Sequence, residues 1–385
     1  SLLPAAWLKK QFCKKRSIND PAALLFSSGS EGSPKGIVLS HKNIMSNIKQ
    51  IASVLDTRHD DVIMGTLPIF HAFGLTVTTL MPLTEGLRLV VHPDPTDVLN
   101  VGKLVAKHEA TLFCGTSTFL RLFTRNRKVS PLMLQSLRLV VAGAERLQPD
   151  VRDGFEKKFN CPIFEGYGAT ETTPVASVNI PDRLEKTHWK THVGNKLGTV
   201  GMALPGSAFK IVDPQSLESL AVGEDGLILI GGTQIMLGYL KDPKKTAEVI
   251  VEQDGLRWYK SGDKGHLDND GFLTIVDRYS RFAKLGGEMV SLTAVEDAIN
   301  GVITQEDVEV LTLNLPDEKK GEKVIALVAG LEDVSTLKSL MIEAKVNPLM
   351  IPSEFIAADI PKLGTGKSDV NTAKSLYLAG ELGAT

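Results

Sequence analysis

Short apolar segments of strand length alternate with helical patterns along the first half of the chain. Residues 22–26, 62–67, 87–91, 111–114, 137–142 and 163–165 are typical of strands, and residues 71–83, 98–107, 119–124 and 151–159 are typical of helices. Ile44, Ile48, Ile51 and Leu55 mark one face of a further helix, for which Ser40 is a suitable N-cap. This alternation predicts parallel βαβ units, which bind ligands at the carboxyl ends of their strands.

The pattern changes after Pro174. Residues 198–212 and 226–232 are typical of strands between turns, whereas residues 255–271 are polar and resemble a run of turns. Beyond Met289, helical patterns at 294–299 and 336–344 and strand patterns at 308–313 and 324–328 indicate a small α+β unit. We therefore expect an α/β fold with a core over residues 1–277, β-rich from residue 198, and a small mobile carboxyl-terminal domain over residues 278–385.

The composition is that of a globular protein. The chain has 385 residues, 43% of them apolar, which suits two or three domains. A net charge of −2 argues against a nucleic-acid partner, and no apolar run approaches the ~18 residues of a membrane helix. Cys13, Cys114 and Cys161 are scattered, which predicts incidental thiols in a reducing compartment. The start at Ser1, with charges after the first apolar residues, suggests no signal peptide and a piece of a longer protein.

Residues 27–36 (SSGSEGSPKG) lie between a predicted strand and a predicted helix. Glycines let backbone N–H groups face a phosphate, and the hydroxyls and Lys35 add donors and charge. The spacing is not that of a Walker A loop, and a flexible polar turn explains this segment equally well. In residues 361–368 (PKLGTGKS), Lys367 suits contact with a developing negative charge or is a solvated surface lysine.

Residues 165–171 (EGYGATE) directly follow a predicted strand. The Tyr167 ring can stack on a purine, the Thr170 hydroxyl can bind phosphate, and the Glu171 carboxylate can hold Mg²⁺, which prefers oxygen ligands. In residues 258–263 (WYKSGD), Asp263 on a loop can accept hydrogen bonds from both hydroxyls of a ribose. Each segment, taken alone, is also explained by an ordinary turn.

The order and spacing of these motifs together resemble the adenylate-forming superfamily of acyl-CoA synthetases, luciferases and non-ribosomal adenylation domains. Residues 27–36 match its phosphate loop, 168–171 its ATP/Mg²⁺ motif, 259–263 its ribose motif, Arg278 its hinge arginine and Lys367 its catalytic lysine. Glu31 in the phosphate loop and residues 114–120 (CGTSTFL), 140–147 (VVAGAERL) and 281–292 (RFAKLGGEMVSL) are similar to acyl-acyl-carrier-protein synthetases joined to a 2-acylglycerophosphoethanolamine acyltransferase.

This resemblance implies that ATP and a fatty acid form an acyl-adenylate, and that the thiol of acyl carrier protein, or of coenzyme A, accepts the acyl group. It implies catalytic roles for Lys367, Thr170, Glu171 and His71, with Glu171 as the Mg²⁺ ligand and Gly287 and Glu288 on the thiol side. The implied nucleotide site contains Ser27, Ser28, Gly29, Ser30, Glu31, Gly32, Lys35, Gly143, Ala144, Glu145, Glu165, Gly166, Tyr167, Thr170, Asp263, Arg278 and Lys367. The implied parent protein is associated with the cytoplasmic face of the inner membrane, this segment being soluble.

The chain departs from the family pattern in three places. Only the residues up to Phe26 precede the phosphate loop, so we expect the amino-terminal subdomain to be missing. Arg281 stands where the family usually has its hinge acid. Residues 182–195 resemble an insertion, in which His188 and His192 have the spacing of a helical metal pair; without a third ligand we favour a solvated loop.

Several alternatives stay open at this stage. His71, beside aromatic residues, could be a packed core histidine. The basic cluster of Lys9, Lys10, Lys14, Lys15 and Arg16 could be a solvated face, or could attract an acidic carrier protein or anionic lipid. The competing functions are a coenzyme A ligase, a catalytically inactive nucleotide-binding fragment, and a phosphoryl-transferring P-loop enzyme that uses the GKS at 366–368.

Overall fold

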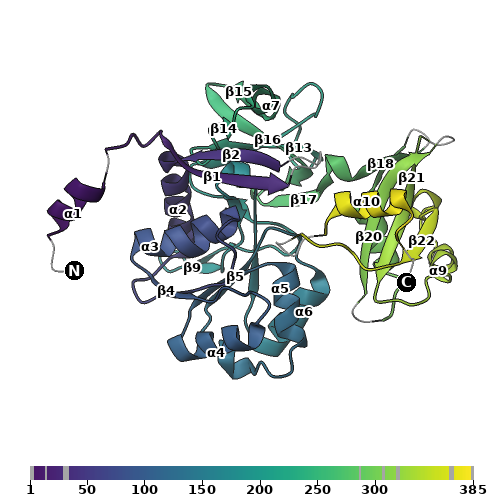
Figure 1. Ribbon diagram of the computed structural model, residues 1–385, viewed down its shortest axis with the longest axis horizontal. Helices are drawn as coiled ribbons and strands as arrows, with labels where there is room; N and C mark the ends of the chain where they lie inside the picture. Colours follow the sequence, from purple (N-terminus) through teal and green to yellow (C-terminus); the bar gives the residue numbers. More distant parts are fainter. Residues whose placement is uncertain are drawn as a thin grey trace.

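The chain starts with a helix and a β-hairpin. The computed structural model describes residues 4–13, 15–28, 34–285, 288–305, 308–317, 321–363 and 368–382. Helix α1 (Ala5–Phe12) stands away from the other elements, and strands β1 (Pro21–Ser28) and β2 (Pro34–Ser40) follow it (Figure 1). The two strands pair antiparallel, with β14 (Gly238–Tyr239) on the other side of β2. The expectation that residues 27–36 join a strand to a helix is wrong, because Pro34 and Lys35 already belong to β2.

Helix α2 (His41–Leu55) forms as the sequence predicts. The Ser40 hydroxyl accepts a hydrogen bond from the Asn43 backbone N–H at 3.1 Å, and the Asn43 side-chain oxygen accepts one from the Ser40 N–H at 2.9 Å. This capping box satisfies two backbone donors that the first turn leaves unpaired. The predicted apolar face of α2 is buried against the central sheet.

The central sheet has the strand order β11–β8–β7–β6–β5–β3–β4. Strands β3 (Val62–Gly65), β4 (Arg88–Val91), β5 (Leu112–Gly115), β6 (Leu139–Ala142) and β7 (Ile163–Gly168) are parallel, which confirms the predicted βαβ units. Strands β8 (Val175–Val178) and β11 (Met202–Ala203) extend the sheet antiparallel. The carboxyl ends of β5, β6 and β7 therefore lie at one edge of the sheet.

Helices cover both faces of this sheet. Helices α4 (Val98–His108), α5 (Ser117–Arg125) and α6 (Pro149–Phe159) pack on one face, with the short helix η2 (Pro131–Leu134) nearby. On the other face lie α2, the π-helical segment η1 (Phe73–Leu80) and α3 (Met81–Glu85). Successive residues of β3 point to opposite faces: Ile63 packs under α2 and η1, whereas Val62 and Met64 pack under α4, α5 and α6. The single helix predicted over residues 71–83 is thus wrong in detail, because it begins as a π-helix.

A second sheet follows, with the order β12–β13–β16–β15 and β17 on β16. Its elements are β12 (Ser207–Val212), β13 (Gly226–Gly232), α7 (Pro243–Val249), β15 (Ile250–Gln253), β16 (Leu256–Leu267) and β17 (Leu273–Arg278). The prediction of a turn-rich segment over residues 255–271 is wrong, because β16 pairs with strands on both sides. Its polar side chains lie in a paired strand because the partner strands supply its backbone hydrogen bonds.

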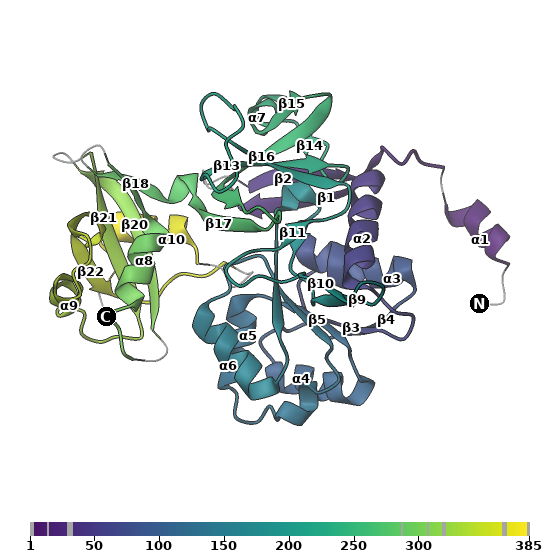
Figure 2. The same cartoon turned by 180° about the vertical axis from the view of Figure 1, so that it is seen from behind.

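The last part of the chain forms a separate lobe at one end of the molecule (Figures 1 and 2). Its sheet contains β18 (Phe282–Leu285), β19 (Glu288–Ser291), β20 (Glu309–Asp317), β21 (Gly321–Ala329) and β22 (Glu354–Ala357). Helices α8 (Leu292–Asn300) and α9 (Leu337–Glu343) pack on one face and α10 (Val370–Ala379) on the other. The short helices η4 (Tyr279–Arg281) and η5 (Pro348–Met350) complete it. The predicted small α+β pattern is present, and none of the described helices is long and apolar enough to cross a bilayer.

Candidate active site

Two segments predicted to bind nucleotide meet at the carboxyl ends of β6 and β7. Gly143, Ala144 and Glu145 follow β6 directly, and Glu165 to Tyr167 lie within β7. A Cβ atom on Gly143 would lie 3.4 Å from the Gly166 carbonyl oxygen and 3.2 Å from the Phe73 ring. Ala144 adopts the left-handed conformation, with φ of 71°, which turns the chain away from the sheet. The predicted edge thus brings together β6, β7 and the start of η1.

The carboxylates of this edge are bound by protein groups. Glu165 forms an ion pair with Arg152 of α6, and both side chains are largely buried. Burial raises the pKa of Glu165, although Arg152 opposes the shift. The Glu145 carboxylate accepts a hydrogen bond from the Thr118 backbone N–H in the first turn of α5. Glu145 therefore ties the loop after β6 to α5, and Glu165 ties β7 to α6.

A second cluster joins Tyr167, Asp263 and Arg278. The Tyr167 hydroxyl donates to Asp263 Oδ2 at 2.5 Å, and Arg278 Nε donates to Oδ1 at 2.9 Å. The Asp263 side chain is 5% exposed, whereas that of Arg278 is 63% exposed. Burial and the adjacent Asp263 charge raise the pKa of Tyr167 well above its ordinary value. The predicted loop position of Asp263 is wrong, because Asp263 lies on β16 and faces Arg278 of β17 in the strand register.

Thr170 and Glu171 begin the short helix η3 (Thr170–Thr172) after β7. The chain turns sharply before it, since a Cβ atom on Gly168 would lie only 1.8 Å from the Pro174 carbonyl oxygen. Glu171 is 9% exposed, and its Oε1 accepts a hydrogen bond from the Tyr239 hydroxyl at 2.9 Å. Lys35 Nζ lies 5.6 Å from the centre of the Tyr239 ring. Tyr239 thus links the strand that follows the predicted phosphate loop to Glu171.

Sequence reasoning missed Tyr239, Arg152 and Arg146. Tyr239 forms part of β14, a strand of two residues with no motif around it. Arg152 and Arg146 are ordinary charges in the sequence, and only the packing of α6 and α8 gives them partners. The Gly238-Tyr239 pair, ahead of a Pro-started helix, is the one signal that could have pointed to a buried tyrosine.

His71 lies just before η1 and is partly exposed. Its Nδ1 accepts a hydrogen bond from the Phe73 backbone N–H at 3.3 Å, which requires that Nδ1 carry no proton. Gly74 is required here, because a Cβ atom would lie 2.1 Å from the Pro68 carbonyl oxygen. Through Phe73, this turn is packed against Gly143.

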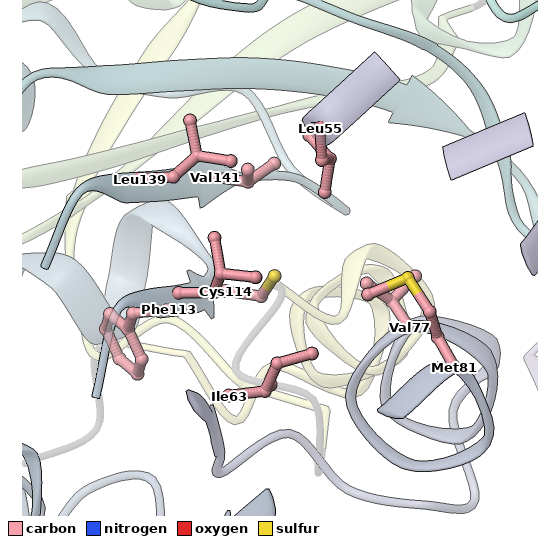
Figure 3. Close-up of a pocket in the computed structure, with 9 residues that line it drawn as sticks. Leu55, Ile63, Val77, Met81, Phe113, Cys114, Leu139 and Val141 are labelled. Atoms are coloured by element: carbon pink, nitrogen blue, oxygen red, sulfur yellow. The ribbon is translucent and has the colours of Figure 1, made fainter. Parts of the chain in front are cut away.

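An apolar cavity lies between the sheet and η1. It is lined by Leu55, Ile63, Val77, Met81, Leu112, Phe113, Cys114, Leu139 and Val141. Figure 3 shows Leu55, Val77 and Met81 on helices opposite Ile63, Cys114, Leu139 and Val141 on strands. Each of the lining residues is at most 7% exposed, and burial raises the pKa of the Cys114 thiol to about 12. The thiol therefore stays protonated, which agrees with its interpretation as an incidental buried group.

At the junction between the two lobes, the adjacent residues Asp277 and Arg278 bind different lobes. Arg278 binds Asp263 of the core, whereas Asp277 accepts hydrogen bonds from the Ser291 and Thr293 hydroxyls at the start of α8. Arg281, at the usual position of the hinge acid, forms an ion pair with Glu296 of α8. One guanidinium nitrogen of Arg146 also donates to both carboxylate oxygens of Asp297 on α8, at 3.1 Å to Oδ1 and 3.0 Å to Oδ2.

The remaining predicted residues are placed as follows. Ser27 lies in β1, where it pairs with Lys35, and Ser28 ends that strand. Glu288 is exposed at the start of β19. Gly29, Ser30, Glu31, Gly32, Gly287 and Lys367 lie outside the described residues. His188 and His192 lie on a hairpin of β9 (Arg183–Glu185) and β10 (Lys190–His192), and no group of three or more His, Cys, Asp and Glu suited to a metal occurs among the described residues.

Comparison with known proteins identifies the class. The sequence pattern of the AMP-binding enzyme family matches residues 4–240, and the chain belongs to this family. It is 36% identical over 283 residues to a probable 4-coumarate–CoA ligase 1 of Dictyostelium discoideum, covering 72% of this chain and 48% of that protein. It is 29% identical over 353 residues to a long-chain-fatty-acid–CoA ligase of Bacillus subtilis, covering 89% and 60%. The chain thus spans about half to three fifths of these relatives.

Solved structures agree on the fold. ATP-bound MatB from Rhodopseudomonas palustris superposes with a TM-score of 0.81 at 26% identity, covering 95% of this chain and 70% of that one. The o-succinylbenzoate CoA synthetase MenE from Bacillus subtilis, in complex with its acyl-adenylate intermediate, gives 0.76 at 25% identity, covering 93% and 70%. The fold is therefore that of adenylate-forming enzymes, as the motifs implied.

Proposed function

We propose that this chain uses ATP to activate a fatty acid as its acyl-adenylate and then transfers the acyl group to a pantetheine thiol. The observation that carries the proposal is the hydrogen-bonded cluster of Tyr167, Asp263 and Arg278 beside the carboxyl end of β7. The Tyr167–Asp263–Arg278 cluster offers hydrogen-bonding groups suited to a ribose. A small, closed apolar cavity lies between Val141 of β6 and Val77 of η1. We assign the nucleotide to the polar cluster, and we propose that the acyl chain enters between the sheet and η1, where this cavity marks the loosest packing.

The first step is the attack of a carboxylate oxygen on the α-phosphorus of ATP. The bond from this phosphorus to the bridging oxygen breaks, and pyrophosphate leaves with that oxygen. Asp263 and Arg278 would hold the ribose, Tyr167 would border the base, and Lys35 and Thr170 would face the phosphates. Lys367, which lies outside the described residues, would contact the reacting oxygens. Positioning and charge stabilisation suffice, since the chemistry needs no nucleophile from the protein.

Glu171 would hold Mg²⁺, which neutralises phosphate charge when bound. Mg²⁺ commonly takes one or two carboxylates from a protein, with phosphate oxygens and water as its other ligands. The nearly buried Glu171, fixed through Oε1 by Tyr239, fits that requirement.

In the second step the thiol loses its proton, its sulfur attacks the acyl carbonyl, and the bond to AMP breaks. Coenzyme A is supported as the acceptor by the likeness to a long-chain-fatty-acid–CoA ligase. Acyl carrier protein is supported by residues 114–120, 140–147 and 281–292, which resemble acyl-acyl-carrier-protein synthetases. We propose that residues 278–385 rotate between the steps and bring Gly287 and Glu288 toward the thiol.

The test is ATP–pyrophosphate exchange with a long-chain fatty acid and Mg²⁺, followed by transfer assays with each acceptor. We expect fatty-acid-dependent exchange, AMP as the product, and a decrease of about 10²–10³-fold in Lys367→Ala. Absence of exchange in the folded protein would contradict the proposal in favour of an inactive nucleotide-binding fragment, and ADP formation would indicate phosphoryl transfer instead. The acceptor assays separate coenzyme A from carrier protein.

A further inference from the structure

The β9–β10 hairpin carries exposed apolar and basic side chains. Trp189 is 73% exposed and Leu184 is 51% exposed, with Val193 and Leu197 exposed at its base. The hairpin lies on the near face of the molecule in Figure 2, below α2. A tryptophan with this exposure is unusual, because burial of an aromatic side chain is favourable.

The turn of the hairpin holds Trp189 in a fixed position. The Glu185 carboxylate accepts hydrogen bonds from the backbone N–H groups of Thr187 and His188 at 2.5 and 2.7 Å. Hydrogen bonds from Thr187, and then from His188, lower the pKa of Glu185 to about 2, so this carboxylate stays ionised at neutral pH. Trp189 itself has φ of 55°, a conformation that few side chains with a Cβ adopt. The chain therefore maintains a constrained turn that presents its largest apolar side chain to solvent.

The base of the hairpin is also fixed. Asp182 Oδ1 accepts hydrogen bonds from the backbone N–H groups of Gly194 and Asn195 at 2.8 and 3.3 Å. Arg183 lies against the end of α2, where a guanidinium nitrogen is 3.7 Å from Asp56 Oδ2. Leu55, the residue before Asp56, lines the apolar cavity. The hairpin thus projects from the end of α2 that borders the cavity.

Basic side chains outnumber acidic ones on the hairpin, since Arg183, Lys186 and Lys190 stand against Asp182 and Glu185. Lys186 and Lys190 flank Trp189 in the sequence. Lys190 pairs with Glu185 through the backbone of the hairpin, but neither lysine ammonium forms an ion pair or hydrogen bond with a described side chain. The nearby Asp182 and Glu185 accept hydrogen bonds from backbone N–H groups, and Glu185 Oε2 also lies 3.1 Å from His188 Nδ1. Lys196, farther along, is paired with Asp268 and Asp270. The two lysines beside Trp189 are therefore the charges available to a partner.

We propose that the β9–β10 hairpin is a membrane-surface anchor that inserts Trp189 and Leu184 into the interfacial region of an anionic lipid bilayer. Tryptophan favours the interface between headgroups and acyl chains, and lysines beside it attract anionic headgroups. A narrow protruding hairpin suits a fluid bilayer, which adapts to its shape, better than a folded protein partner, which needs a broad complementary surface. Charge complementarity and the protruding apolar tip select the lipid surface.

The test is co-sedimentation of the whole chain with vesicles of phosphatidylglycerol and phosphatidylcholine, compared with phosphatidylcholine alone. We expect binding to the anionic vesicles that weakens with salt, and a decrease of about tenfold or more in Lys186→Glu/Lys190→Glu, since each lysine contributes roughly fivefold. Lys128→Glu/Lys338→Glu, which reverses two exposed lysines elsewhere, is the matched control and should bind as the wild type does.

Fluorescence locates the inserting side chain. In a Trp7→Phe background the remaining tryptophans are Trp189 and Trp258, which is 3% exposed. Anionic vesicles should therefore shift the emission to shorter wavelength, and Trp189→Phe should abolish the shift while the Trp258 emission reports an intact fold. Equal binding by the hairpin variants and the wild type, an unshifted emission, or binding to an acidic carrier protein without binding to vesicles would each overturn the proposal.

Discussion

Asp263 is the residue on which the candidate nucleotide site most depends. Its buried carboxylate accepts from both Tyr167 and Arg278, so it fixes two neighbours as well as offering oxygens to a ribose. We expect Asp263→Asn to raise the KM for ATP about 10- to 100-fold, since hydrogen bonds to a charged group each contribute about 1.5–3 kcal/mol. The KM is measured by pyrophosphate exchange at saturating fatty acid.

Tyr167→Phe is the matched control for Asp263→Asn. It removes one donor to Asp263 and retains both the carboxylate and its pairing with Arg278. We expect a smaller increase in the KM, about fivefold, for the loss of a single hydrogen bond. If Asp263→Asn folded normally and kept the wild-type KM for ATP, the ribose-binding role would be wrong.

At the scale of elements, Asp61 joins three parallel strands at their amino ends. Its carboxylate accepts hydrogen bonds from Arg138 Nε at 2.9 Å and from the Thr111 hydroxyl at 2.6 Å, which precede β6 and β5. Burial alone would raise the pKa of Asp61, but the bonds from Arg138 and Thr111 outweigh it and lower this pKa below its ordinary value of 3.8. The ionised form therefore stabilises the fold.

This shift predicts a pH-dependent stability. Because the folded pKa is depressed, the stabilisation is present above the unfolded value and is lost as the pH falls through the folded pKa. We expect Asp61→Asn to lower the free energy of unfolding by about 3 kcal/mol at pH 7, since it breaks a buried ion pair. Denaturant unfolding should show this difference shrinking below pH 4. The exposed Asp60→Asn should have almost no effect, and a difference that stayed constant with pH would contradict the assignment.

The cavity under η1 gives a prediction about the acyl chain. Val77 is 3% exposed and lines this small cavity, so Val77→Phe should obstruct the proposed acyl path between the sheet and η1. We expect the ratio of exchange rates with long-chain to short-chain acids to fall about tenfold or more, because each lost methylene contact is worth ~1 kcal/mol or more. Val101→Phe, buried on the opposite face of the sheet, controls for overpacking and should leave the ratio unchanged. An unchanged ratio in Val77→Phe would separate the cavity from the acyl site.

Periodicity and turn signals predicted most elements, and they failed where distant partners decide the conformation. The parallel strands and α2 follow from local patterns, since each buries one apolar face. Residues 255–271 are polar and still form β16, because β13, β15 and β17 pair with it. The motifs named Tyr167 and Asp263, which hydrogen-bond to each other, and Glu171, which binds Tyr239. Arg152 carries no motif, and its partner Glu165 follows only from the packing of α6 on β7.

At the scale of the whole molecule, the two lobes are joined by an ion pair that can be exchanged without disturbing either core. Arg146 follows Glu145 at the candidate site, and its partner Asp297 lies on α8 of the small lobe. Both side chains are about half exposed, at 52% and 51%, so the pair should add at most ~1 kcal/mol to stability. Its larger effect should be on the arrangement of the lobes, since it acts between them.

We therefore expect Arg146→Asp to weaken this arrangement while the denaturant midpoint of the core stays close to that of the wild type. Small-angle scattering should show a larger radius of gyration, and adenylation and thiol transfer should change by different factors, because the proposed rotation separates the two steps. Arg146→Asp/Asp297→Arg restores the pair with its charges exchanged and should recover both properties. If the single variant matched the wild type in scattering and in both rates, the contact would be a passive surface pair.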